Sequence, residues 1–183
     1  MPIIWICGLV PQITSVTKAT RSMMMLANFL QPGLVPNAST LQVAIERYGF
    51  PLIIPDNWDV SSREGDFKFE LAGGRADAQY DYDRFESEFF DIDEFIENEE
   101  LDKGPERLLR NAVADRTRCL CFVLAGEPEH AAVGFILSYC LVKDFGAVCF
   151  DADLLMGESV EPLSLEAIKA EVDDLIVGHL STT

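Results

Sequence analysis

The sequence contains little histidine and little positive charge. Its 183 residues include two histidines, and its 14 Lys and Arg residues stand against 31 Asp and Glu residues, a formal net charge of −17. Histidine is the residue that most often moves protons in enzymes, so this chain is poorly supplied for acid–base catalysis. A surface this negative repels nucleic acid and anionic lipid and attracts basic proteins or cations. We therefore expect no nucleic-acid partner and no membrane partner.

Neither histidine stands in a catalytic context. His130 falls in the first turn of the apolar helix that contains EPEHAAV, and His179 falls in the last turn of the final helix. A cysteine nucleophile would need a neighbouring histidine and an electropositive setting, which the negative field of this chain does not provide. We therefore predict no catalytic residues and a protein that is not an enzyme.

The cysteines lack the pattern of a disulfide framework and the spacing of a zinc site. There are five, at positions 7, 119, 121, 140 and 149, and all lie in apolar runs such as RCLCFVL. An odd count in strand-like contexts predicts reduced, buried thiols. Cys119 and Cys121 share one face of a strand, but no second pair of Cys or His residues follows at zinc-like spacing. We expect no metal at this pair.

Long apolar runs and phosphate-binding loops are also missing. The N-terminal MPIIWICGLV is too short to span a bilayer and lacks the basic region and cleavage site of a signal peptide. We expect a strand at residues 3–10 and a cytoplasmic protein. The glycines of AGGRAD are paired and do not connect a strand to a helix, so they indicate a turn and no cofactor site.

Periodicity predicts a single α+β domain over residues 1–183, with a mixed or antiparallel β-sheet and helices packed on it. Two glycines join two alternating segments into a hairpin. Ser39 and Ser164 are expected to cap helices, and Pro128 to start a buried one. The order strand, helix, strand over 118–153 fits either a parallel or an antiparallel pair. The expected strands are 3–10, 66–72, 76–83, 118–125 and 147–153, with 51–58 extended; the expected helices are 14–30, 40–49, 105–116, 126–146 and 164–180.

The negative charge is concentrated in the segment from Tyr80 to Asp102. Eleven of its 23 residues are Asp or Glu and only Arg84 is basic, so the segment carries −10 of the net −17. Acidic tails seldom contain aromatic residues, because nothing in them needs burial. This segment holds six aromatic residues: Tyr80, Tyr82, Phe85, Phe89, Phe90 and Phe95.

Two interpretations of this segment stay open. Tyr80 and Tyr82 alternate with Asp81 and Asp83 as in a strand, and Phe85, Phe89, Ile92 and Ile96 would form one face of a helix. The segment is then a solvated helix that docks by an aromatic stripe. Phe90 and Phe95 lie off that stripe, however, and aromatic anchors among carboxylates are typical of a protein–protein hot spot. The expected partner-binding residues are Phe90, Asp91, Asp93, Glu94, Phe95 and Glu97.

A carboxylate pair follows the last strand. Asp151 and Asp153 in FDAD share one face and could hold Mg²⁺ or Ca²⁺. A metal site needs further converging ligands, and the sequence identifies none, so we favour solvent-exposed residues that end the strand and expect no bound metal.

The segments FKFELAGGRADAQYDY and CLCFVLAGEPEHAAVGFILSYCLVKDFGAVCFDAD resemble those of small bacterial immunity-type proteins. In that pattern a strand with a glycine turn precedes a strand that bears Glu or Tyr, and a later strand ends in G-x-x-E, here Gly126 and Glu129. An Ala-rich helix and a G-x-V-x-D strand come next. Here they correspond to the helix from Ala131 and to Gly146 and Val148, with Asp151 one position later than in that spacing. The resemblance covers residues 66–155. It implies a protein encoded beside a polymorphic or type VI secreted toxin, which it neutralises by binding.

Composition and resemblance together lead to one main hypothesis and two alternatives. The main one is an immunity or inhibitor protein that binds a cognate toxin, one with a basic cleft, through its acidic–aromatic segment. The sequence does not fix its oligomeric state. The first alternative is a non-catalytic structural or adaptor domain, which would include a dimeric one. The second is a divalent-metal-dependent enzyme using Asp151, Asp153 and a carboxylate from the acidic segment.

Overall fold

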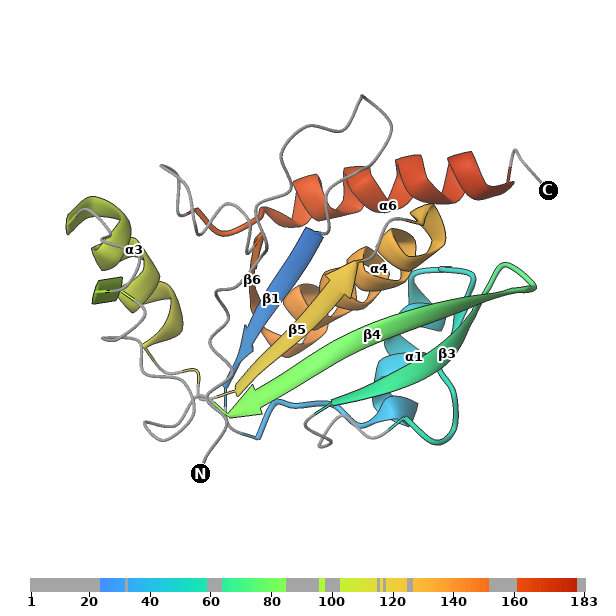
Figure 1. The fold of residues 1–183 in the computed structure, drawn as a ribbon, viewed down its shortest axis with the longest axis horizontal. Helices are drawn as coiled ribbons and strands as arrows, with labels where there is room; N and C mark the ends of the chain where they lie inside the picture. Colours follow the sequence, from blue (N-terminus) through green and yellow to red (C-terminus); the bar gives the residue numbers. More distant parts are fainter. Residues whose placement is uncertain are drawn as a thin grey trace, which may run out of the picture.

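The described part of the chain forms an α+β fold around one antiparallel sheet, as the sequence predicted (Figure 1). The computed structural model describes residues 24–31, 33–58, 64–84, 96–97, 103–114, 116, 118–124, 127–151 and 161–180. Six strands lie in the order β2-β3-β4-β5-β1-β6. They are β1 (Met24–Leu30), β2 (Leu52–Ile53), β3 (Glu64–Leu71), β4 (Gly74–Arg84), β5 (Arg118–Leu124) and β6 (Val148–Asp151). The helices are α1 (Ala38–Arg47), α3 (Lys103–Val113), α4 (Pro128–Phe145) and α6 (Leu165–Leu180).

The predicted helix over residues 14–30 is wrong in its last part, because Met24–Leu30 forms β1 in the interior of the sheet. All seven residues of β1 pair with β5, and residues 26–29 also pair with β6. Leu26 and Leu30 face one core, whereas Ala27 and Phe29 face the other. Met, Leu and Ala favour helices in isolation, but a strand that is buried on both faces is apolar throughout, and tertiary packing overrides propensity. The strand expected at residues 3–10 lies outside the described residues.

Strand β1 also settles the direction of β5 and β6, which the sequence left open. Both are antiparallel to β1 and lie on either side of it. They therefore run parallel to each other, and α4 connects them across β1. This arrangement is a split βαβ unit.

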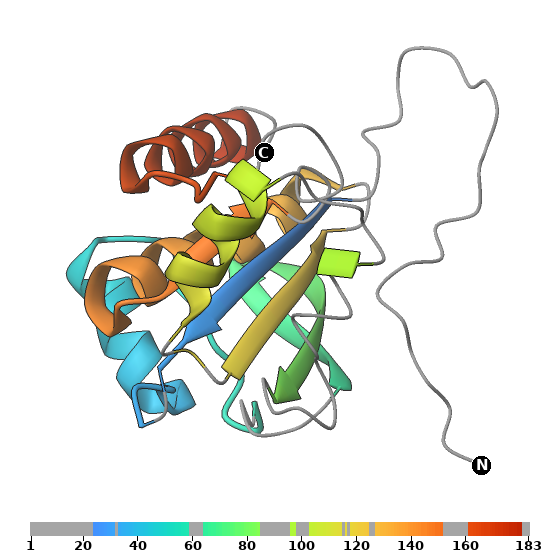
Figure 2. The ribbon, with the colours of Figure 1, turned by 90° about the vertical axis from the view of Figure 1, so that its left-hand side faces the viewer.

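The sheet separates two cores of unequal size. Helix α4 crosses one face and is covered in turn by α1 and α6, as Figures 1 and 2 show. Residues 132–141 of α4 are all buried, as its apolar sequence predicted. On the other face α3 places Leu109 and Val113 against Phe29 and Phe150, whose rings meet edge to face at 5.7 Å. That smaller core covers only β5, β1 and β6.

The helix ends follow local chemistry closely. Asn37, and not the expected Ser39, caps α1, since its Oδ1 accepts hydrogen bonds from the Thr40 N–H at 2.8 Å and from the Ser39 hydroxyl at 2.7 Å. The cap predicted at Ser164 is confirmed, because its hydroxyl accepts from the Ala167 N–H at 3.1 Å. Helix α4 starts at Pro128 and ends at Gly146, which adopts a left-handed conformation.

The predicted hairpin is confirmed as β3 and β4. Leu71 pairs with Gly74, so Ala72 and Gly73 form a two-residue loop. Both have positive φ, 51° and 82° respectively. This is the pattern of a type I′ turn, which favours Asn-Gly because a Cβ is strained at positive φ.

One polar contact lies inside the larger core. Asn28 of β1 and Ser138 of α4 are both fully buried, and the Asn28 amide donates to the Ser138 hydroxyl at 3.0 Å. The Ser138 hydroxyl also lies near the Cys149 thiol on β6: burial raises the pKa of that thiol, and Ser138 lowers it. The contact therefore links the central strand, the edge strand and the helix that connects β5 to β6.

We expect Ser138→Ala to lower the free energy of unfolding by about 1–3 kcal/mol, because it leaves the buried Asn28 amide without its nearest partner. Adding Asn28→Leu should recover most of the loss, since both polar partners are then replaced by apolar groups. Urea unfolding of the three variants measures this. A single variant as stable as the parent would contradict the expectation.

We expect Ala72→Asn to raise the free energy of unfolding by about 0.5–1 kcal/mol, because Asn tolerates positive φ better than Ala does. Gly73→Ala is the matched control and should lower it by about 1 kcal/mol, since it adds a Cβ at positive φ. Thermal unfolding of the parent and both variants tests this expectation. Equal melting temperatures for all three proteins would show that the backbone at Ala72 and Gly73 is not strained.

Candidate functional site

The described residues include only one of the six expected partner-binding residues. Glu97 is exposed, and its neighbour Ile96 is 7% exposed and packs with Leu109 and Val113 in the smaller core. Ile96 is therefore buried, as its place in the predicted aromatic stripe requires. The remaining members of that stripe, Phe85, Phe89 and Ile92, and the expected partner-binding residues Phe90, Asp91, Asp93, Glu94 and Phe95 lie outside the described residues.

The beginning of the acidic segment is a strand, as predicted. Residues 80–84 form the end of β4, and Asp81 pairs with Glu64 of β3 on one side and with Cys121 of β5 on the other. Two acidic residues therefore occupy directly opposed positions of β3 and β4.

The register extends this acidic character over the whole hairpin. On β3, Phe69 and Leu71 are buried beneath the sheet, whereas Lys68 and Glu70 are exposed on the opposite face. By the register, the strand positions that alternate with the buried ones form one set, which we call the acidic sheet face: Glu64, Asp66, Lys68, Glu70, Arg75, Asp77, Gln79, Asp81 and Asp83. Six of these nine residues are acidic and two are basic, which gives a formal charge of −4. Of the nine, Lys68 and Glu70 are the two whose side chains the structure describes, and both are exposed.

The acidic sheet face lies on the same side of the sheet as α3. Asp83 pairs with Cys119, which belongs to the smaller core beneath α3. In Figure 1, α1 and α4 lie behind the sheet, and no described helix lies in front of β3 and β4. The described helices thus cover one face of the hairpin.

Helix α3 carries the opposite charge. Lys103 and Arg107 are exposed, and Arg110 forms an ion pair with Glu106 at 2.9 Å. Leu108, between them, is 46% exposed. On this side of the sheet, the described residues include acidic positions on β3 and β4 and, over β5, β1 and β6, a basic helix with an exposed apolar residue. The spacing of Lys103, Arg107 and Arg110 is the sequence signal for this basic surface, and it was not among the features recognised from the sequence.

A small open depression borders the acidic sheet face at its edge. Its lining residues are Ile53, Pro55, Lys68, Phe69 and Glu70. Ile53 pairs with Glu70, so it lies on the same face, and it is 53% exposed. A depression this open, with Lys68 and Glu70 in its lining, lacks the enclosure and apolar lining typical of a small-molecule site.

The buried cysteines are poor nucleophiles. Cys140 and Cys149 are free and buried, and burial raises the pKa of each thiol to about 12. Both are therefore protonated at neutral pH. Cys119 is buried and Cys121 half-buried on the face below α3, as their spacing predicted, whereas Cys7 lies outside the described residues.

The other candidate groups are described only in part. Asp151 ends β6 and is half-buried, and Asp153 lies outside the described residues. His130 is in the first turn of α4 and His179 in the last turn of α6, as predicted. Within the described ranges, no group of three or more His, Cys, Asp or Glu side chains is placed to hold a metal ion.

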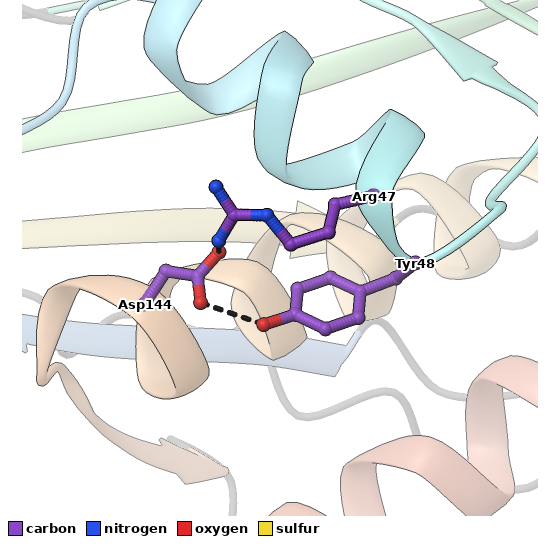
Figure 3. Close-up of polar contacts among 3 residues, drawn as sticks. All are labelled: Arg47, Tyr48 and Asp144. Carbon is purple, nitrogen blue, oxygen red and sulfur yellow. Dashed lines mark hydrogen bonds and ion pairs between the residues drawn. The ribbon is translucent and has the colours of Figure 1, made fainter.

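A second polar cluster lies on the helical side of the sheet (Figure 3). Asp144 of α4 accepts hydrogen bonds from the Tyr48 hydroxyl at 2.6 Å and from Arg47 at 3.1 Å. The Tyr48 ring meets Tyr139 edge to face at 5.2 Å, and Phe50 does the same at 5.3 Å. The cluster joins the end of α1 to the end of α4, which makes it a structural clamp. The hydrogen bond to Asp144, together with burial and the charge of Asp144, raises the pKa of Tyr48.

Comparison with protein-family models, curated proteins and solved structures finds no match to this chain. Among the described helices, none combines the length and apolarity required to cross a membrane. The function must therefore be inferred from the surface itself.

We expect the Tyr48 clamp to weaken at alkaline pH. The pKa of Tyr48 in the folded protein is raised above the ordinary value of 10.0. The contribution of the Tyr48 hydroxyl to stability is therefore complete below about pH 10, and it is lost as the pH rises through the folded-state pKa. The difference in melting temperature between the parent and Tyr48→Phe should be largest near neutral pH and shrink above about pH 10. A difference that stays constant to high pH would contradict the role of this hydroxyl.

Proposed function

We propose that this protein is an immunity or inhibitor protein that binds and neutralises a cognate bacterial toxin. The observation that carries the proposal is the acidic sheet face on β3 and β4, which no described helix covers and which continues along the chain into the acidic–aromatic segment. Carboxylates gathered on one open surface speed and orient the approach of a basic partner.

The proposed contact combines charge with aromatic anchors. Aromatic side chains in the centre of an interface supply affinity, and surrounding charges supply selectivity and speed of association. Glu97 is exposed and next to the buried Ile96, which fixes the end of the segment on the same side of the sheet as α3. The proposed anchors and charges are Phe90, Asp91, Asp93, Glu94, Phe95 and Glu97.

The charge also indicates the kind of toxin. A partner with a basic cleft fits an acidic surface, and enzymes that act on anionic substrates such as nucleic acids have such clefts. In this proposal the protein performs no chemistry. It occupies the cleft in place of the substrate. The two buried thiols with raised pKa values are consistent with a non-catalytic role.

We expect neutralising Asp91, Asp93, Glu94 and Glu97 to slow association with the toxin by about tenfold and to flatten its salt dependence, because these charges steer the encounter. Stopped-flow kinetics at several salt concentrations measures both. The matched control neutralises four exposed carboxylates near or on α6, on the other side of the sheet: Glu161, Glu166, Glu171 and Asp174.

The control removes the same net charge from another part of the surface. It therefore distinguishes an effect of the charges at the proposed interface from an effect of the overall net charge. It should change the association rate by less than about twofold. Equal slowing in both variants would show that only the net charge matters. No slowing in either would place the interface elsewhere.

A further inference from the structure

Strand β2 forms one edge of the sheet and is only two residues long. Pro51 precedes it, and Pro55 follows shortly after. The Ala72 N–H donates to the Pro51 carbonyl at 2.7 Å, and Ile53 pairs with Glu70. Hydrogen-bonding direction alternates along a strand, so Leu52 and Ile54 direct their backbone groups away from β3, toward the free edge.

A side-chain amide occupies this edge. Nε2 of Gln42, on α1, donates to the Leu52 carbonyl at 3.3 Å, and its Oε1 accepts from the Ile54 N–H at 2.8 Å. The amide thus makes the two hydrogen bonds that a peptide group of a neighbouring strand would make. Glu46, one turn further along α1, accepts a hydrogen bond from the same Nε2 at 3.2 Å. One side chain therefore pairs with two of the outward backbone groups of β2.

The opposite edge of the sheet is closed differently. The Cys149 carbonyl of β6 accepts a hydrogen bond from the Leu163 N–H at 2.8 Å, so main chain before α6 covers that strand. Backbone coverage cannot be removed by a point substitution, whereas coverage by a side chain can. Unpaired edges recruit other strands, and natural sheets block them.

We propose that β2 is a self-complementary pairing surface, and that the Gln42 amide blocks it and keeps the protein monomeric. The occupant that fits the exposed edge is β2 of a second copy. This proposal does not depend on the proposed toxin partner.

Two-fold symmetry supports this choice of occupant. In an antiparallel pair centred on Ile53, the Ile54 N–H of each copy meets the Leu52 carbonyl of the other, so both outward groups of both copies are satisfied. Ile53 would face its own counterpart as a non-hydrogen-bonded pair, with the two Cα atoms about 4.5 Å apart. Each copy would then bury a side chain that is now 53% exposed, while Leu52 and Ile54 stay in their own cores.

The net charge opposes this pairing. Two copies that each carry −17 repel one another, and salt screens that repulsion. Pairing should therefore be stronger at high salt, which is the opposite of the salt dependence expected for a basic partner on the acidic sheet face.

Sedimentation equilibrium of Gln42→Ala tests the proposal, from micromolar concentrations to about 0.5 mM, at about 0.05 M and 0.5 M salt. Alanine is the best helix former, so the substitution preserves α1. We expect the parent to stay at the 20.4 kDa of one chain, and the variant to approach twice that mass, more readily at high salt. Val43→Ala is the matched control, since it truncates the neighbouring exposed residue of α1, and should leave the chain monomeric.

A second substitution tests the surface itself. Ile53→Lys in the Gln42→Ala background places a charge at the centre of the two-fold pair and should restore the monomer. A folded Gln42→Ala variant that remains monomeric throughout would overturn the proposal, as would a dimeric parent. A dimer that persists after Ile53→Lys would show that the second copy binds at another surface. Circular dichroism confirms that each variant is folded.

Discussion

The pairing of β1 with two strands at once is the interaction on which the rest of the structure depends. Hydrogen bonds to β5 on one side and β6 on the other hold β6 in the sheet and make β5 and β6 parallel. That geometry carries α4 across the sheet, because a connection between parallel strands must cross one face. Asn28 favours this pairing register of β1 over others, because its amide reaches the Ser138 hydroxyl only in this register. A shift of β1 by one residue would place Asn28 on the α3 side and Phe29 against α4.

The position of α4 explains which face of the hairpin the described helices cover. Helix α4 lies behind β3 and β4, α1 and α6 pack against α4, and the clamp of Tyr48 on Asp144 joins the ends of α1 and α4. On the other side, α3 packs on β5, β1 and β6 through Leu109 and Val113. Among the described side chains of β3, Phe69 and Leu71 are buried whereas Lys68 and Glu70 are exposed, which is common in half-buried antiparallel strands.

Sequence periodicity predicted the helices and strands whose burial follows a regular pattern along the chain. It missed those whose conformation depends on contacts with residues far away in the sequence. Helices α4 and α6 and the hairpin followed from apolar spacing, Pro128, Ser164 and the Ala72–Gly73 turn region. Strand β1 was missed because MMLANFL favours a helix until two neighbours pair with it. The acidic strand residues near Tyr80 were recognised from composition. Their continuation through Glu64 and Asp66 needed the register, and the Gln42 contact with β2 depends on tertiary packing that no local pattern records.

The central claim is that the uncovered face of β3 and β4, with the acidic segment that continues it, meets a protein partner. Hydrogen exchange of the chain, alone and in complex with a partner recovered from its native host, tests this most directly. Slower exchange in β3, β4 and residues 80–102, with α6 unchanged, is the predicted result. Slowing confined to α1, α4 and α6 would contradict it, because the partner would then bind the helical side of the sheet.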